Sequence, residues 1–352
     1  MSKKRILVAP LNWGLGHATR CIPIINELVR QDFEPVIASD GAALELLRKE
    51  FPDLEHHVLP EYNITYSKKN TFFKLKLLSQ TPKIIAAIQQ ERKTTKKLVD
   101  SHNISGIISD NRWGVRSKKV PSVFITHQLK VLSGSSTLLS SKIQQKLISK
   151  FTECWVPDFE EKPNLSGEMG HLEKTPFSVR YIGPLSRFTK LQLPVKHNYA
   201  ILLSGPEPQR EILEELLLKE FKNYSSPVLV VRGVLEKESK SEKMGNLKIY
   251  NYLIGRELEE ALNSSEAIIC RSGYTSVMDI AKLEKKAFFI PTPGQPEQEY
   301  LAKDLTKKGF VDSCDQNKFT LKKLENLENT SGLSFDFFTS SFSAAFGLFQ
   351  CK

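Results

Sequence analysis

A polar turn in the last third of the chain combines residue types that bind anions. The apolar run 267–270 is typical of a short buried parallel strand, and it stops at an Arg-Ser-Gly turn, residues 271–273. From Thr275 onward, apolar residues recur near helical spacing, which predicts a helix whose free N–H groups and positive dipole end face whatever lies above the strand. The turn is therefore a candidate phosphate site. An ordinary strand-to-helix turn is the alternative.

More polar side chains follow the next predicted strand. Residues 287–291 are predicted to form that strand, and a Pro- and Gly-rich loop leads from it to Glu297, Gln298 and Glu299. Open α/β sheets bind ligands at the carboxyl ends of their strands. We therefore expect this loop to belong to a ligand site.

A histidine near the N-terminus is the candidate proton acceptor. Residues 6–10 predict a strand, and a loop containing Gly14 and Gly16 follows it. The dinucleotide fingerprint is incomplete because Thr19 occupies its third glycine position, so NAD is not favoured. His17 lies at the carboxyl edge of the strand, where a neutral imidazole can accept a proton. The alternative is a helix-capping or core histidine.

Asp110 and His127 each lie at the end of a predicted strand, 106–110 and 122–126 respectively. The carboxyl ends of parallel strands share one edge of the sheet, so both residues are expected on the same edge as His17. Asp110 would orient an imidazole or an acceptor hydroxyl there. A solvated loop aspartate is the alternative interpretation.

The loop with Gly14, Gly16 and His17 and the later stretch 266–300 occur in the same order as in family-28 glycosyltransferases of the GT-B fold, which they resemble. This family includes the UDP-N-acetylglucosamine transferase of lipid-linked peptidoglycan precursor synthesis. The resemblance implies an α/β GT-B architecture with two Rossmann-like domains whose parallel sheets face a central cleft. It also implies a UDP-sugar donor, an acceptor that is lipid-linked or part of a cell-envelope glycan, and no cofactor.

The resemblance further implies roles for individual residues. His17 matches the presumed base or acceptor-positioning group, and Asp279 stands where the family usually has a Glu that holds the ribose of UDP. Gln298 matches a Gln that contacts the donor sugar, although the family usually carries a second Gln where this chain has Glu299. Arg187 matches an arginine that contacts the donor.

The glycine-rich loop of the family corresponds here to residues 204–205, with Pro206 and Pro208 in place of the expected Ser and Gly. The two prolines leave fewer backbone N–H groups for a phosphate. Leu253 lies where the family's backbone contacts uracil. The complete set of candidates is His17 and Asp110 for catalysis, and Gly14, Gly16, Arg187, Ser204, Gly205, Leu253, Arg271, Ser272, Gly273, Thr275, Ser276, Asp279, Gln298 and Glu299 for substrate binding.

The length of 352 residues and the hydrophobic content of 40% suit two soluble α/β domains. We expect an N-terminal acceptor domain over residues 1–185, a linker over 186–198 and a donor domain over 199–334. Residues 335–352 are expected to form a helix that returns to the first domain, as in other GT-B folds.

Several classes of site and partner are disfavoured. The net charge is +10, but the lysines are dispersed without stacking aromatic residues, which disfavours nucleic acid. The five cysteines are scattered without a C-x-x-C pair, and there is no D-x-D motif and no clustered His or Cys at ligand spacing. We therefore expect no metal, so the leaving group would be met by the helix N-terminus and by Arg187 or Arg271.

The expected location is the cytoplasm, because the sequence shows no signal peptide and no membrane-spanning stretch. Phe72, Phe73, Lys74 and Lys76 combine aromatic and basic residues that suit a peripheral contact with the inner face of the cytoplasmic membrane. The alternative is an ordinary helix with snorkelling lysines.

Three functions remain open from sequence. An inverting, metal-independent glycosyltransferase is favoured, and the transferred sugar is expected to be an N-acetylhexosamine or a hexose. A UDP-sugar epimerase of similar fold and a non-catalytic subunit that binds nucleotide sugars are the alternatives.

Overall fold

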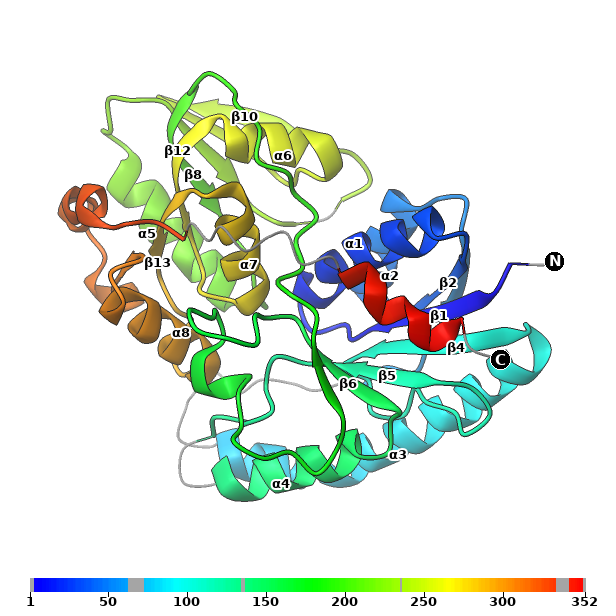
Figure 1. The fold of residues 1–352 in the computed structure, drawn as a ribbon. Helices are drawn as coiled ribbons and strands as arrows, with labels where there is room; N and C mark the ends of the chain where they lie inside the picture. The colour runs from blue at the N-terminus through cyan, green and yellow to red at the C-terminus, as the bar shows by residue number, and fades with distance from the viewer. Residues whose placement is uncertain (1–2, 63–72, 134–136, 235, 334–341, 351–352) are drawn as a thin grey trace.

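The protein folds into two α/β domains, each built around a seven-stranded sheet (Figure 1). The computed structural model describes residues 3–62, 73–133, 137–234, 236–333 and 342–350. Most strands in both sheets are parallel, and each domain covers its sheet with helices, as Figure 1 shows. This arrangement confirms the predicted GT-B architecture.

The N-terminal sheet is parallel throughout, with the strand order β3-β2-β1-β4-β5-β6-β7. Its strands are β1 (Arg5–Pro10), β2 (Glu34–Ser39), β3 (Glu55–Val58), β4 (Ile104–Asp110), β5 (Ser122–Ile125), β6 (Glu153–Val156) and β7 (Val179–Tyr181). Its helices are α1 (Gly16–Arg30), α2 (Gly41–Glu50), α3 (Phe73–Ser101) and α4 (Thr137–Ile148), with a short 3-10 turn η3 (Gly167–Met169). The central strands are continuous buried runs because helices cover both of their faces.

The C-terminal sheet has the order β10-β11-β9-β8-β12-β13-β14, and only the described pair β10·β11 at its edge is antiparallel. Its strands are β8 (His197–Leu202), β9 (Val228–Val231), β10 (Ser241–Met244), β11 (Leu247–Tyr250), β12 (Ser265–Cys270), β13 (Lys286–Phe289) and β14 (Asp312–Ser313). Its helices are α5 (Gln209–Phe221), α6 (Gly255–Asn263), α7 (Tyr274–Leu283) and α8 (Pro296–Lys307), followed by the 3-10 segments η4 (Gln316–Lys318) and η5 (Leu321–Asn329).

Both sheets contain the reversal of strand order at which doubly wound folds bind ligands. In the N-terminal sheet the strand order reverses between β1 and β4, and in the C-terminal sheet it reverses between β8 and β12. At such a switch point the two following loops diverge to opposite faces and leave a crevice at the carboxyl ends of the strands. The loops after β1 and β4 and those after β8 and β12 carry most of the predicted site residues.

The C-terminal segment η6 (Phe342–Phe349) packs on the N-terminal domain. The Phe346 ring lies 6.4 Å from the Phe33 ring and 5.7 Å from the Trp155 ring, measured between centroids. Phe349 covers Gly106 of β4 so closely that a Cβ at this glycine would lie 2.3 Å from the phenyl ring. Lys4 Nζ donates to the Phe349 carbonyl oxygen at 3.1 Å.

Four short strands were not predicted: β6, β7, β10 and β14. Each has four residues or fewer, so its apolar pattern is too brief to distinguish a strand from a loop. The predicted membrane contact at Phe72 lies outside the described residues, and so do the side chains of Phe73, Lys74 and Lys76. No helix in the described part of the chain is long and apolar enough to cross a membrane.

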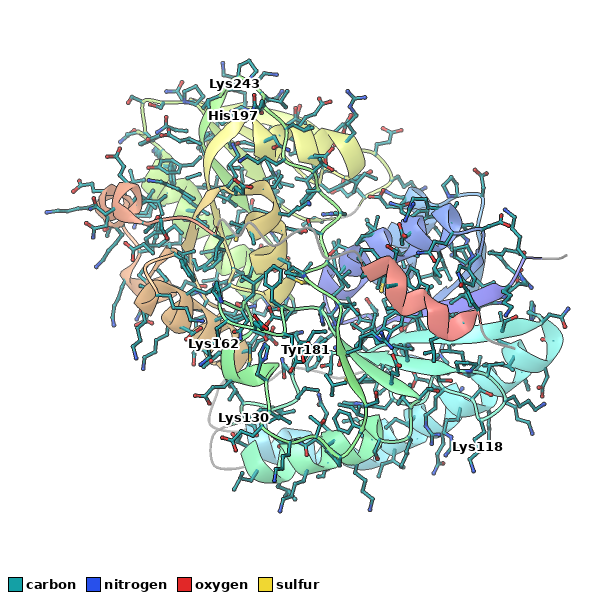
Figure 2. All side chains as sticks on the ribbon, viewed as in Figure 1. Lys118, Lys130, Lys162, Tyr181, His197 and Lys243 are labelled. Atoms are coloured by element: carbon teal, nitrogen blue, oxygen red, sulfur yellow. The ribbon has the colours of Figure 1, made fainter. Side chains whose placement is uncertain are left out.

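The positive charge is spread over the surface. Lys118, Lys162 and Lys243 are exposed, and Figure 2 shows them on separate edges of the molecule. A nucleic-acid site gathers its cations on one face or along one groove.

Candidate active site

His17 and Asp110 meet at the N-terminal switch point. His17 is in the first turn of α1, directly after β1, and Asp110 is the last residue of β4, paired in register with Pro10. His17 Nδ1 lies 2.9 Å from Asp110 Oδ1, and the imidazole is 15% exposed, so it remains accessible to a ligand. The two residues are 93 positions apart in the sequence. Both were predicted at this edge of the sheet because His17 follows one strand and Asp110 ends another.

Arg20 is a third member that the sequence analysis missed. One turn after His17 in α1, its wholly buried guanidinium donates to both carboxylate oxygens of Asp110 through Nε and Nη2. Its Nη2 is also 2.8 Å from His17 Nδ1, and its Nη1 is 3.3 Å from His127 Nδ1. A charged residue is rarely buried unless it is paired, and Asp110 provides that pair.

The hydrogen-bond partners determine where the imidazole protons lie. Arginine only donates, so His127 Nδ1 accepts from Arg20, and its Nε2–H points at Glu297 Oε1, 3.0 Å away. His17 Nδ1 contacts both the Asp110 carboxylate, which accepts, and Arg20 Nη2, which donates. In the tautomer that donates to Asp110, the bond is charge-assisted. The Nε2 atom of His17 then carries the lone pair of a general base.

Electrostatics support the same assignment. Burial raises the pKa of Asp110, but the Arg20 guanidinium and His17 outweigh burial and hold that pKa well below its ordinary value. Burial and the neighbouring Arg20 charge lower the pKa of His17 below the ordinary 6.5. At neutral pH the site therefore contains a carboxylate and a neutral imidazole, which is the protonation state that proton abstraction requires.

Side chains of the C-terminal domain close over this group. Thr275 Oγ1 donates to the Gly16 carbonyl oxygen at 3.1 Å, and a Cβ at position 16 would lie 3.0 Å from that hydroxyl oxygen, so the close approach favours glycine. Tyr274 stacks on the His127 ring with centroids 4.2 Å apart. Glu297, from α8, accepts from His127. The loop after β1 and the N-terminus of α7 are thus in direct contact.

Glu297 was expected in the ligand loop after β13, but its contact with His127 of the N-terminal domain was not predicted. It also accepts from Gln128 Nε2, so one carboxylate joins two side chains that follow β5. Although burial raises the pKa of Glu297, the charges of His127, His17 and Arg20 lower it overall. The contact crosses 170 residues of sequence, and no local pattern indicates it.

The predicted anion turn leaves open space for a ligand. Gly273 is the N-cap of α7, and nothing lies within 4 Å of the position a Cβ would take there. Ser204 and Gly205 follow β8 on the neighbouring strand and are both exposed, with Gly205 at φ +102°. Thr275 and Ser276 in the first turn of α7 are partly exposed. The N–H groups of a helix N-terminus bind phosphate in such a position.

Asp279 lies between one and two turns along α7 from this N-terminus, and Arg187, from the segment between β7 and β8, is its electrostatic neighbour. Asp279 Oδ1 accepts from Ser186 Oγ at 2.7 Å. Burial raises the pKa of Asp279 to about 6, against the opposing charge of Arg187. Burial lowers the pKa of Arg187, because it disfavours the charged guanidinium. The Nε and Nη1 atoms of Arg187 are buried without a hydrogen-bond partner among the described residues. Glu50 Oε1 is 4.0 Å from Arg187 Nη1, too far for a hydrogen bond.

Arg271 has a different environment from the one predicted. Its Nη1 donates to the carbonyl oxygens of Ile290 and Pro291 at 3.0 and 3.1 Å, and its Nη2 donates to the Gln209 carbonyl at 2.7 Å. The guanidinium therefore supports the backbone around the switch point and does not face the open side of the turn. Arg187 remains as the candidate cation for the leaving group.

Some of the remaining candidate residues hold the backbone of a loop in place, and others are exposed to solvent. Ser272 Oγ donates to the Gln298 carbonyl, and Gln298 Oε1 accepts from the Thr292 N–H at 2.8 Å, so these contacts order the loop after β13. Glu299 is exposed and accepts from the Gly294 N–H. Leu253 is buried, and Gly14 is exposed at φ +71°.

The architecture is the GT-B fold, and known structures agree. The chain superposes on the glycosyltransferase of kitacinnamycin with a TM-score of 0.65 at 13% identity, covering 99% of this chain and 95% of that one. Residues 206–330 match the family model "Glycosyltransferase family 28 C-terminal domain".

Curated relatives extend the similarity over most of the chain. An uncharacterised glycosyltransferase of Methanopyrus kandleri is 22% identical over 317 residues, which is 85% of this chain and 89% of the relative. The UDP-N-acetylglucosamine–N-acetylmuramyl-(pentapeptide) pyrophosphoryl-undecaprenol N-acetylglucosamine transferase of Buchnera aphidicola is 24% identical over 353 residues, covering 94% and 90%. The protein is a glycosyltransferase that resembles family 28.

Proposed function

We propose that the protein is an inverting, metal-independent transferase that moves a sugar from a UDP-sugar to an acceptor hydroxyl. The observation that carries this proposal is the contact between the two switch points, in which the start of α1, where His17 pairs with Asp110 of β4, meets the N-terminus of α7 through Gly16 and Thr275. The base of the N-terminal domain can then act on a bound acceptor while the anion site of the C-terminal domain holds the donor.

The proposed reaction is a single displacement. His17 Nε2 takes the proton of the acceptor hydroxyl while the oxygen attacks the anomeric carbon from the face opposite UDP. The bond between that carbon and the phosphate oxygen breaks, and its electron pair leaves with UDP. Asp110 stabilises the imidazolium that forms, and the N–H groups at Gly273–Ser276 together with Arg187 stabilise the departing diphosphate.

The relatives support a choice of substrates. The Buchnera aphidicola relative is named for transfer of N-acetylglucosamine from its UDP form to a lipid-linked muramyl peptide. We therefore propose a UDP-activated N-acetylhexosamine or hexose as the donor and a lipid-linked or cell-envelope acceptor. The proposed location is the inner face of the cytoplasmic membrane, where such an acceptor is presented.

Product analysis tests the proposal. The protein is incubated with UDP-N-acetylglucosamine, UDP-N-acetylgalactosamine or UDP-glucose and with undecaprenyl-linked acceptors, with and without EDTA. A glycosylated lipid of inverted anomeric configuration, formed equally in EDTA, is the expected result. An epimerised sugar nucleotide would support the epimerase instead, and bound UDP without turnover would support a non-catalytic subunit.

Two substitutions separate nucleotide recognition from sugar recognition. Asp279→Ala is expected to weaken UDP and UDP-sugar by a similar factor, because ribose is common to both ligands. Gln298→Ala is expected to weaken only the UDP-sugar. Isothermal titration with both ligands measures the two ratios, and Lys303→Ala, an exposed residue further along α8, is the control. Equal losses for both ligands in the Gln298 variant would contradict its assignment to the sugar.

A described surface also suits a membrane contact. Leu138, Leu139 and Ile143 of α4 are 78%, 64% and 54% exposed, and Lys142 and Lys146 are exposed beside them on the same helix. Apolar side chains flanked by lysines suit the interface of an anionic bilayer. In Figure 1, α4 lies on the outer side of the N-terminal domain, away from the C-terminal sheet.

We predict that the protein co-sediments with vesicles containing phosphatidylglycerol at low salt and that the double variant Leu139→Asp with Ile143→Asp does not. Each lysine near an anionic surface contributes about 1 kcal/mol, so salt should release the wild-type protein. The control is Val195→Asp, a change at an exposed apolar residue of the linker. Equal sedimentation of the double variant and the wild type would contradict a contact through α4.

A further inference from the structure

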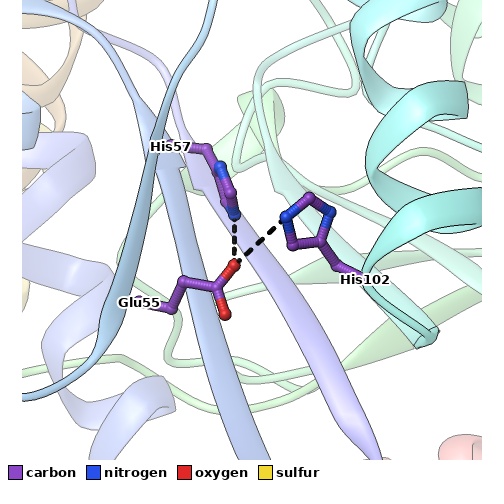
Figure 3. Close-up of side chains that lie close together, drawn as sticks. All are labelled: Glu55, His57 and His102. Atoms are coloured by element: carbon purple, nitrogen blue, oxygen red, sulfur yellow. Dashed lines mark hydrogen bonds and ion pairs between the residues drawn. The ribbon is translucent and has the colours of Figure 1, made fainter.

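A second cluster of ligating side chains lies at the opposite edge of the N-terminal sheet. Glu55 and His57 stand two residues apart on the edge strand β3, and His102 precedes β4 (Figure 3). His57 Nε2 is 2.6 Å from Glu55 Oε1, and His102 Nε2 is 3.5 Å from the same oxygen. The two imidazole rings meet edge to face, with centroids 4.6 Å apart.

Hydrogen bonding turns the lone pair of His102 towards this cluster. The Ser101 hydroxyl donates to the Lys97 carbonyl at 2.7 Å, so its oxygen is available to accept from His102 Nδ1, 2.6 Å away. A proton on Nδ1 leaves Nε2 with its lone pair, and that atom faces a carboxylate oxygen. His102 Nε2 and Glu55 Oε1 would then both be acceptors, and a cation between them would stabilise this arrangement. A hydroxyl that holds the far nitrogen of a histidine is also how proteins orient metal ligands.

The ion pairs around the cluster leave one oxygen of Glu55, Oε1, available to a cation. Arg5 donates to Glu55 Oε2 and, through Nε, to Glu34 Oε1 at 3.0 Å. Arg5 therefore neutralises one of two carboxylates, and Glu55 Oε1 is left facing the two histidines. The three side chains are partly exposed, at 37% for Glu55, 22% for His57 and 32% for His102, so an ion can reach them from solvent.

We propose that Glu55, His57 and His102 bind a transition-metal ion of the zinc type. Their ligand atoms lie within 4.8 Å of one another, and tetrahedral zinc with bonds near 2.0–2.1 Å needs separations of about 3.3 Å, which small side-chain rotations reach. Two imidazoles and a carboxylate form a frequent zinc set, with water as the fourth ligand. His57 and His102 are 45 positions apart in the sequence, which explains why ligand spacing did not indicate the site.

The ion would stabilise the fold and take no part in transfer. Glu55 and His57 are on the edge strand β3, and β2 separates this strand by about 10 Å from β1, the strand that leads to His17. Bound metal would tie the edge strand β3 to the segment between α3 and β4. Zinc is therefore expected to raise the melting temperature and to leave turnover unchanged, whatever reaction the other edge performs.

Cobalt spectroscopy on the full chain tests the site. After EDTA treatment and its removal, one equivalent of Co²⁺ should produce the visible absorption of a tetrahedral N/O site, and Zn²⁺ should displace it. Zn²⁺ should raise the melting temperature, and Mg²⁺ should not, because oxygen-rich octahedral sites suit Mg²⁺. His57→Gln and His102→Gln should each lose the spectrum, while His197→Gln, a partly exposed histidine at the start of β8, should retain it.

Three results would overturn the site. The first is a wild-type protein without a Co²⁺ spectrum, which would make the cluster a hydrogen-bonded imidazolium and carboxylate. The second is a spectrum that survives both variants, which would place the metal elsewhere. The third is an equal thermal shift with Mg²⁺. The wild-type measurements do not depend on whether either variant folds.

Discussion

Replacing His17 by alanine is expected to lower turnover by roughly 10²- to 10⁴-fold, the contribution of a positioned general base. Affinity for UDP should remain nearly unchanged, because the proposed nucleotide site belongs to the other domain. Single-turnover rates and isothermal titration measure the two quantities separately. Full turnover in the variant would make His17 a structural residue, and loss of UDP binding in step with activity would contradict the division of roles between the domains.

The pH profile provides an independent readout for the same residue. Burial and Arg20 lower the pKa of His17 below 6.5, so the neutral base persists at neutral pH and is lost only as the pH falls further. The acidic limb of the rate profile should therefore lie below 6.5 and should disappear from the residual activity of His17→Ala. His171→Ala, which removes a histidine 3.3 Å from buried Asp158, is the control and should keep the limb.

Asp110→Ala is expected to cost about 3–5 kcal/mol of folding free energy, because it leaves the buried Arg20 charge without its partner. Adding Arg20→Met should recover part of the loss, since no orphan charge then remains. Urea unfolding measures both variants. The control is Asp100→Ala, which removes an exposed partner of Lys119 and should cost about 1 kcal/mol or less.

The pH dependence of this stabilisation has a definite sign. The folded-state pKa of Asp110 is depressed, so its contribution is present above the ordinary value of 3.8 and is lost as the pH falls through the folded-state pKa. The wild type should thus lose more stability on acidification below 3.8 than Asp110→Ala does. A cost of Asp110→Ala no larger than that of Asp100→Ala would contradict the role given to the Asp110–Arg20 pair.

Local sequence patterns were sufficient to predict the central strands of both sheets. β1, β4, β8 and β12 are buried apolar runs that stop at polar or glycine-containing turns, and each carries its signal within ten residues or so. The His17 and Gly273 loops follow such strands, so their positions at the switch points could be predicted. Asp110 was predicted at the correct edge because it ends a strand.

Residues whose role depends on distant contacts were not predicted. Arg20 follows His17 by one helical turn, and nothing nearby in the sequence distinguishes it from a solvated surface arginine. Its burial depends on Asp110, 90 residues away, and the position of Glu297 depends on His127, 170 residues away. Arg271 shows the opposite case. Its place in the motif suggested a ligand contact, whereas its Nη atoms donate to backbone carbonyls from two other segments and to the side-chain oxygen of Gln316.

The return of η6 to the first domain means that the covalent chain passes between the domains twice, once before β8 and once after η5. Two covalent connections restrict the relative movement of two domains more than a single connection does. The Thr275–Gly16 and Glu297–His127 contacts would separate in the same movement, so entry of an acceptor and departure of the spent nucleotide would share a single motion.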